Sequence, residues 1–153
     1  MQDLTSSIYT FEDLIHGNYL YVDKTEYIWK LIRPYKGIYF MSRPRRFGKS
    51  LTVSTLKAIF QGKKELFDGL AISDMNYDWK EYPVIHLDMA NCDTKTPLEL
   101  RKYLVHILAE LAITHNVSVD IQEDGLAASF ESLLRVIAKK SSIVILLDEY
   151  DKP

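Results

Sequence analysis

Residues 37–51, with the sequence G-I-Y-F-M-S-R-P-R-R-F-G-K-S-L, contain the residue types that bind phosphate. An apolar stretch leads into a loop rich in Arg and Pro, after which Gly48, Lys49 and Ser50 open a predicted helix. The free N–H groups and the positive dipole end of a helix N-terminus attract anions. In such loops a Lys reaches the β- and γ-phosphates of a nucleotide and a Ser hydroxyl reaches Mg²⁺. We therefore expect Lys49 to bind phosphate and Ser50 to bind the metal ion.

One position departs from the general phosphate-loop motif G-x-x-x-x-G-K-[ST]. Arg43 stands where that motif has its first Gly, and Pro44 supplies no backbone N–H. The residues expected to surround the phosphates are Arg43, Pro44, Arg45, Arg46, Phe47, Gly48, Lys49, Ser50 and Leu51. A turn followed by a helix that happens to begin with basic residues is the alternative interpretation.

A second group of candidate residues closes an aliphatic run, I-V-I-L-L-D-E, at residues 143–149. Five consecutive aliphatic residues favour a strand buried on both faces, as in a parallel sheet. Open α/β sheets bind their ligands at the carboxyl ends of the strands, where Asp148 and Glu149 fall. We expect Asp148 to hold Mg²⁺ and Glu149 to orient or deprotonate the attacking water. Together with the loop, this pair favours nucleotide binding or hydrolysis.

Composition indicates an ordinary globular chain. Its 153 residues are 47% hydrophobic and 26% charged, which favours a single domain. The net charge of -2 argues against a dedicated nucleic-acid or membrane-surface binder. The one cysteine, Cys92, excludes an internal disulfide and fits a reducing compartment. No apolar run approaches the ~20 residues of a membrane span, and the N-terminus lacks a signal-peptide pattern, so we expect a cytoplasmic protein with no membrane partner.

Several other residues are of types that can take part in chemistry. The cluster Arg43, Arg45 and Arg46 could instead bind the backbone of a nucleic acid. Asp88 could face the same crevice as Asp148, although a strand-terminal turn is the simpler role for it. Four aromatic residues could stack on adenine but more commonly serve the core; they are Tyr19, Tyr21, Tyr27 and Trp29. The four histidines lack metal-ligand spacing, and the role of Asp151 stays open.

The elements that must position these residues follow from periodicity and from capping residues. Helices are expected at 11–16, after Asp23 with Glu26 as its capping partner, at 49–60, near 65–70, after Thr96-Pro97, and before the strand at 143–147. Strands are expected at 37–41, 84–89 and 143–147. This alternation predicts right-handed crossovers and a parallel sheet covered on both faces.

Five segments taken together resemble the bacterial predicted AAA-ATPase-like family. They are Y-V-D-K-T-E-Y-I at 21–28, S-R-P-R-R-F-G-K-S-L at 42–51, E-L-F-D-G-L at 65–70, Y-P-V-I-H-L-D at 82–88 and L-L-D-E-Y-D-K-P at 146–153. In that family the Arg-Pro-Arg-Arg-Phe-Gly-Lys-Ser form replaces the glycine-first loop. The resemblance implies an α/β P-loop NTPase fold with three αβα layers and a mostly parallel sheet. It also implies ATP and Mg²⁺ as ligands, with Lys49 and Glu149 in the catalytic roles and Ser50 and Asp148 as metal ligands.

The resemblance also bears on completeness. We expect one incomplete P-loop ATPase-like domain over residues 1–153, with a lead-in at 1–36 and a nucleotide-binding core at 37–153. We expect this domain to be truncated after the strand at 143–147 and its acid pair, which together form the Walker B motif. Family members often continue into a nuclease-like domain of the PD-(D/E)XK type, through which nucleic acid is a possible partner. In the implied fold the next strand lies between the 143–147 strand and the phosphate-loop strand. We therefore expect a homo-oligomer, a strand-completing partner or a rearrangement, and weak or no hydrolysis by this chain alone.

The expected function is an ATP-binding, Mg²⁺-dependent ATP-hydrolysing switch or motor for an effector domain. The alternatives are a nucleic-acid-binding accessory module and a nucleotide-binding interaction module that does not hydrolyse ATP.

Overall fold

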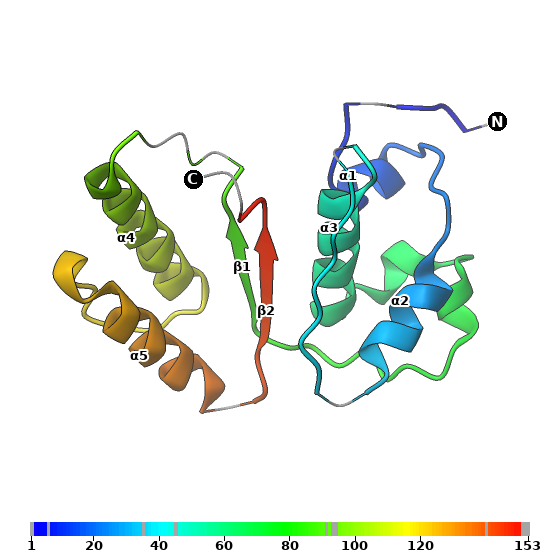
Figure 1. The fold of residues 1–153 in the computed structure, drawn as a ribbon. Coiled ribbons are helices and arrows are strands. Elements are labelled where there is room, and N and C mark those ends of the chain that lie inside the picture. Colours follow the sequence, from blue (N-terminus) through cyan, green and yellow to red (C-terminus); the bar gives the residue numbers. More distant parts are fainter. Residues whose placement is uncertain are drawn as a thin grey trace. The chain divides into compact units, whose positions relative to one another are not determined.

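The protein is described by a computed structural model that covers residues 2–5, 7–34, 36–44, 46–90, 92, 95–139 and 141–150. The chain divides into two compact units, Met1–Glu81 and Tyr82–Pro153, which are taken in turn below. Figure 1 shows the helices and strands of each unit. The prediction of a single nucleotide-binding domain over 1–153 concerns how the two units combine, and it stays a prediction.

The first unit is helical. Its elements are α1 (Phe11–His16), α2 (Thr25–Ile32), α3 (Lys49–Phe60) and the 3-10 helices η1 (Lys64–Phe67) and η2 (Ala71–Asp74). Their apolar faces meet in one core made of Phe11, Ile28, Ala58, Ile59, Leu66, Phe67 and Ile72. Two rings stack at its centre, Phe11 on Phe67, with their centroids 4.6 Å apart. The predicted helices at 11–16 and 49–60 are confirmed, and the one near 65–70 forms as η1.

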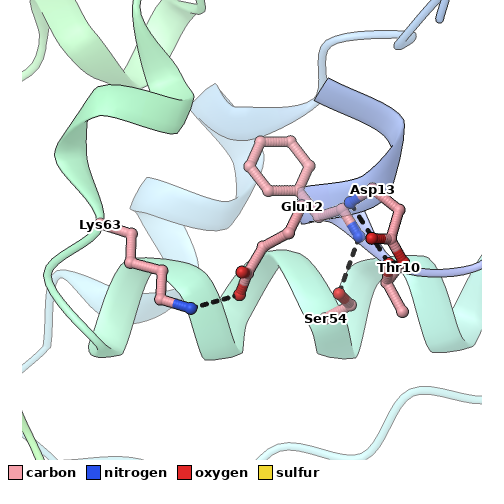
Figure 2. A network of polar contacts seen from close by, with 6 residues as sticks. Thr10, Glu12, Asp13, Ser54 and Lys63 are labelled. Carbon is pink, nitrogen blue, oxygen red and sulfur yellow. Dashed lines mark hydrogen bonds and ion pairs between the residues drawn. The ribbon is translucent and has the colours of Figure 1, made fainter. Parts of the chain in front are cut away.

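Helix α1 is held by polar contacts of its first turn. Thr10 caps its N-terminus by accepting a hydrogen bond from the Asp13 N–H, and the Thr10 hydroxyl in turn donates to the Asp13 carboxylate. The Phe11 N–H donates to Ser54 Oγ on α3 at 2.8 Å, and Glu12 pairs with Lys63. Figure 2 shows these contacts from close by. Since a six-residue helix is too short to be stable alone, these contacts and the burial of Phe11 hold it in place.

The N-cap of helix α2 lies one residue later than predicted. Lys24 occupies the cap position, and in place of the predicted Asp23–Glu26 capping pair the Thr25 N–H donates a hydrogen bond to Asp23 Oδ1 at 2.8 Å. Glu26 instead forms an ion pair with Lys30 on the exposed face of the helix. The start of α2 therefore depends on Asp23 alone, and its second carboxylate oxygen is free to reach another segment.

The predicted strand at 37–41 is absent, so this prediction was wrong for the structure as described. Residues 37–44 belong to neither a helix nor a strand. Their apolar side chains are largely exposed, and Ile38 is 103% exposed. Because a strand exists only through hydrogen bonds to a neighbouring strand, the apolar sequence alone cannot form one.

The second unit contains the sheet. Its elements are β1 (Val84–Asp88), α4 (Pro97–Thr114), the 3-10 helix η3 (Glu123–Gly125), α5 (Leu126–Ala138) and β2 (Val144–Asp148). Both predicted strands form and pair in parallel, from Val84 with Val144 to Asp88 with Asp148. The two helices between them provide the crossover that a parallel pair requires. The predicted parallel pairing is therefore confirmed for these two strands.

Helices α4 and α5 pack together beside the strand pair (Figure 1). The core between them consists of Ile85, Leu108, Leu111, Ala112, Leu133 and Ile137. Helix α4 starts as predicted, with a capping box between Thr96 and Glu99 and with Pro97 at its first position. On β2 the exposure alternates: Ile145 and Leu147 are exposed, whereas Leu146 and Asp148 are buried. The cover that α4 and α5 give to β1 therefore does not extend over these two side chains of β2.

The described part of the chain is a mixed α/β structure with five α-helices and one small, two-stranded parallel sheet. A three-layer P-loop sheet and its truncation after β2 stay predictions. Among the described helices, none is both long enough and apolar enough to cross a membrane.

Candidate functional site

Helix α3 begins where the phosphate-loop motif predicts. Gly48 is its cap residue, with a left-handed φ of 73°, and Lys49 and Ser50 are its first two residues. Glycine adopts this conformation without the strain that a Cβ introduces. Among the described residues, no side chain bonds to the free N–H groups of the first turn as a cap. The start of α3 therefore offers free donors and a positive dipole end, as an anion site requires.

The Lys49 side chain curls back over the loop that precedes it. Its Nζ donates a hydrogen bond to the backbone carbonyl of Arg43 at 2.9 Å. Arg46, within the loop, has a left-handed φ of 65°. The Lys49 ammonium group therefore lies against the Arg43 carbonyl, which places a positive charge beside the loop.

Most of the loop faces solvent. Arg43, Pro44, Arg46 and Phe47 are exposed, while Lys49, Ser50 and Leu51 are half-buried; Arg45 lies outside the described residues. Leu51 packs against the core of the first unit. This apolar contact anchors the first turn of the helix, and the charged side chains remain available to a ligand.

The acidic candidates lie at the carboxyl end of the parallel strand pair. Asp148 ends β2 and is 8% exposed, and its Oδ1 accepts a hydrogen bond from the Glu149 N–H at 3.0 Å. Glu149 follows with a left-handed φ of 51°, so the chain turns sharply directly after the strand. A buried carboxylate requires donors or a cation to offset the loss of solvation. Asp151 lies outside the described residues.

Asp88 is the register partner of Asp148 on the neighbouring strand. Its Oδ1 accepts from the Ala90 N–H at 2.8 Å, which is the strand-terminal turn role expected for it. The Tyr103 hydroxyl of α4 donates to the Asp88 backbone carbonyl at 3.2 Å. Desolvation raises the pKa of Tyr103, and the nearby Cys92 and Asp88 add to this effect, so the phenol stays protonated and able to donate. The structure thus brings Asp88, Asp148 and Glu149 together at one end of the sheet.

The two halves of the predicted site belong to different units. The loop and the start of α3 lie in Met1–Glu81, and the acidic tip lies in Tyr82–Pro153. The convergence of Lys49 with Asp148 therefore stays a prediction. Within the described residues, no group of three or more His, Cys, Asp or Glu side chains could hold a metal ion by itself.

Sequence reasoning missed a polar clamp in the first unit. Asp23 Oδ2 accepts from the Ala71 N–H at 2.7 Å, and Thr25 Oγ1 accepts from the Ile72 N–H at 3.0 Å. One carboxylate therefore serves the starts of both α2 and η2. The sequence signal for it was the D-K-T triplet, but the partners lie far along the chain. Of the adenine candidates, Tyr21 and Trp29 pack against the core instead.

The geometry above can now be compared with known proteins. A family model described as "Predicted AAA-ATPase" matches residues 6–153, which is nearly the whole chain. The chain belongs to this AAA-ATPase-like family. It is also 36% identical, over 155 residues, to an "Uncharacterized protein in vnfD 5'region" of Azotobacter chroococcum mcd 1. No solved structure matches the chain.

Membership of the AAA-ATPase-like family associates the chain with nucleotide binding at a coarse level. The match covers 98% of this chain but 29% of the Azotobacter relative, so the chain spans less than a third of that protein. The activity and partners of a whole AAA-ATPase-like protein of that length are therefore proposals.

Proposed function

We propose that this chain is an ATP-binding module that hydrolyses ATP with Mg²⁺ and acts as a switch or motor for an attached effector. The observation that carries the proposal is the start of α3. There Gly48 takes a left-handed conformation, Lys49 is the first helical residue, and its Nζ donates a hydrogen bond back to the Arg43 carbonyl of the loop. Family membership supports ATP as the nucleotide. A cytoplasmic location fits this role.

Each candidate residue has a role in this proposal. The phosphates are held by residues 43–51, through backbone N–H groups, the Lys49 ammonium and the guanidinium groups of the loop. The Ser50 hydroxyl and the Asp148 carboxylate are hard oxygen ligands of the kind that Mg²⁺ prefers. The ion would offset developing phosphate charge, while Glu149 orients the attacking water and accepts its proton.

The proposal includes a fold in which both units share one sheet. A strand supplied by a longer chain, a second copy or a partner would complete the sheet. A nuclease-like effector acting on nucleic acid is the partner that the family resemblance suggests.

Lys49→Ala tests nucleotide binding. We expect ATP with Mg²⁺ to raise the melting temperature of the wild-type chain and to lose this effect in Lys49→Ala, because binding to the folded state alone stabilises it. Lys57→Ala, further along the same helix, is the matched control and should respond like the wild type. Thermal-shift series with ATP, GTP and ADP, with and without Mg²⁺, provide the measurement. Equal stabilisation of Lys49→Ala and the wild type would contradict the proposal.

Glu149→Gln tests hydrolysis separately. In a chain extended past Pro153, we expect phosphate release to fall by about 10²-fold or more while ATP still binds, because the amide cannot accept the proton of water. Asp148→Asn should instead remove the dependence of binding on Mg²⁺. If wild type and Glu149→Gln bind ATP equally and neither releases phosphate, the non-hydrolysing interaction module is the correct alternative.

The exposure of Arg43, Arg46 and Phe47 favours a second candidate function, nucleic-acid binding. Guanidinium groups bind phosphate backbones, and an exposed aromatic ring can stack on a base. This function predicts DNA or RNA binding that falls steeply with salt and is indifferent to ATP. Fluorescence anisotropy with a labelled oligonucleotide between low and high salt separates it from the ATPase proposal.

A further inference from the structure

Two neighbouring hydroxyl residues on α3, Ser54 and Thr55, make polar contacts, and Ser54 makes its contact with the N-terminal lead-in. Ser54 Oγ accepts the Phe11 N–H of α1 at 2.8 Å, as Figure 2 shows. The next residue, Thr55, is 1% exposed and donates a hydrogen bond to the Leu51 carbonyl at 2.8 Å. Polar groups buried this way stay in place because losing a partner leaves them unsatisfied.

The contacts fix α1 along the side of α3 at two separate points. Ser54 lies in the second turn of α3, and Lys63, which pairs with Glu12, lies just past its end. Figure 2 shows the Ser54 and Lys63 side chains reaching α1 from different places along the chain. Phe11 is fully buried between them in the core. Two separated contacts restrict both sliding of α3 and its rotation about its own axis.

The position of Ser54 connects this packing to the proposed nucleotide site. Residues four apart lie on the same face of a helix, one turn from each other. Ser54 therefore lies one turn below Ser50, and Leu51 lies one turn above Thr55. The lead-in thus holds the turn of α3 that directly supports Lys49 and Ser50.

We propose that Ser54 is a positioning residue, through which α1 sets the orientation of the first turn of α3 and hence of Lys49 and Ser50. This inference rests on the proposed function, since it assigns the lead-in to the nucleotide site. Ser54 itself touches neither nucleotide nor metal in this proposal. The lead-in at 1–36 then contributes to the site by positioning the first turn of α3.

The test compares Ser54→Ala, which removes the acceptor, with Ser54→Thr, which keeps a hydroxyl. Both are examined well below their melting temperatures, where circular dichroism shows each fully folded. Affinity for ATP with Mg²⁺ is measured by calorimetry, and hydrogen exchange is followed at the amides of residues 49–54. Small displacements of a binding group lower affinity steeply. We expect Ser54→Ala to bind at least about threefold more weakly and to exchange faster at these amides, and Ser54→Thr to restore both.

A purely structural role gives a different result. Ser54→Ala would then melt at a lower temperature but bind ATP as the wild type does, and this outcome overturns the proposal. If the wild type itself binds no nucleotide, the proposed function fails, and the exchange data alone decide whether α1 orders the first turn. If Ser54→Ala does not fold, Ser54→Cys replaces it, because sulfur is a weaker acceptor of similar size. Unchanged affinity and exchange in Ser54→Cys would also overturn the proposal.

Discussion

Asp23 shows how a conspicuous acidic residue can serve the fold rather than the chemistry. Its two carboxylate oxygens accept from Thr25 and from Ala71, which lie on opposite sides of α3 in the sequence. Burial alone would raise the pKa of Asp23, but the hydrogen bonds from Ala71 and Thr25 together outweigh it and lower the pKa. The ionised form is therefore the one that the folded chain prefers.

Asp23→Asn should destabilise the chain at pH 7. The amide turns one acceptor into a donor that faces a backbone N–H, which costs about 1–3 kcal/mol for a group left without its partner. Because the folded pKa lies below the unfolded one, the contribution of Asp23 is complete above the unfolded value of about 3.9 and is lost as pH falls through the folded value. Urea unfolding at pH 7 and near pH 3 should show a gap between the variants that closes on acidification.

The exposed Asp68 provides the control for this comparison. Asp68→Asn should unfold at nearly the wild-type urea concentration at both pH values, as substitutions at exposed positions usually do. A gap between wild type and Asp23→Asn that stays constant with pH would show that ionisation of Asp23 does not contribute.

At the scale of elements, the sequence predicted the helix starts that are formed by contacts between residues close together in the chain. The start of α4 was predictable because Thr96, Pro97 and Glu99 are close in sequence and satisfy the first turn among themselves. The Asp23 clamp was not, because its partner Ala71 lies 48 residues away. The strand at 37–41 failed for a related reason, since the apolar pattern contains no information about which strand, if any, lies beside it.

Gly62, just past the end of α3, allows the cost of backbone strain to be distinguished from the cost of a steric clash. Gly62 has a φ of 70°, and a Cβ there would lie 2.8 Å from Glu81 Cγ and 3.0 Å from the Trp79 carbonyl. Gly62→Ala should therefore cost more than the about 1 kcal/mol expected for a left-handed residue alone, because backbone cannot move aside as a flexible side chain can. Chemical denaturation of the purified variant measures the loss.

Gly69 is the matched comparison for Gly62. Its φ of 80° imposes similar strain, but a Cβ there would meet nothing within 4 Å. Gly69→Ala should accordingly show only the strain cost. Equal losses in the two variants would mean that the segment around Trp79 yields to accommodate the extra methyl group.

At the scale of the whole molecule, the described residues form two hydrophobic cores, one in each unit. The first is built around Phe67 and the second around Leu133, and both of these side chains are fully buried. Composition and length do not report how a core is divided, and the single domain that they predict over 1–153 stays a prediction. The structure assigns the loop to one unit and the acid pair to the other, and the meeting of the two stays the central prediction about the site.

Core truncations should act mainly on the unit that contains them. Phe67→Ala should cost about 3–5 kcal/mol and Leu133→Ala about 2–5 kcal/mol, from lost burial and the cavity left behind. In hydrogen-exchange experiments, we expect Phe67→Ala to expose α1, α2 and α3 while β1, β2 and α4 keep more of their protection. Leu133→Ala should show the opposite pattern. Loss of protection throughout the chain in both variants would indicate one cooperative folding unit.

Two of the residues proposed for the site, Arg46 and Glu149, occupy left-handed backbone conformations that glycine would occupy more easily. Replacing either with glycine relieves about 1–2 kcal/mol of steric cost. Laboratory evolution that rewarded heat resistance alone would thus tend to discard the guanidinium and the carboxylate that the proposed reaction uses. Engineering a more thermostable variant of this protein therefore requires a screen that also selects for catalysis.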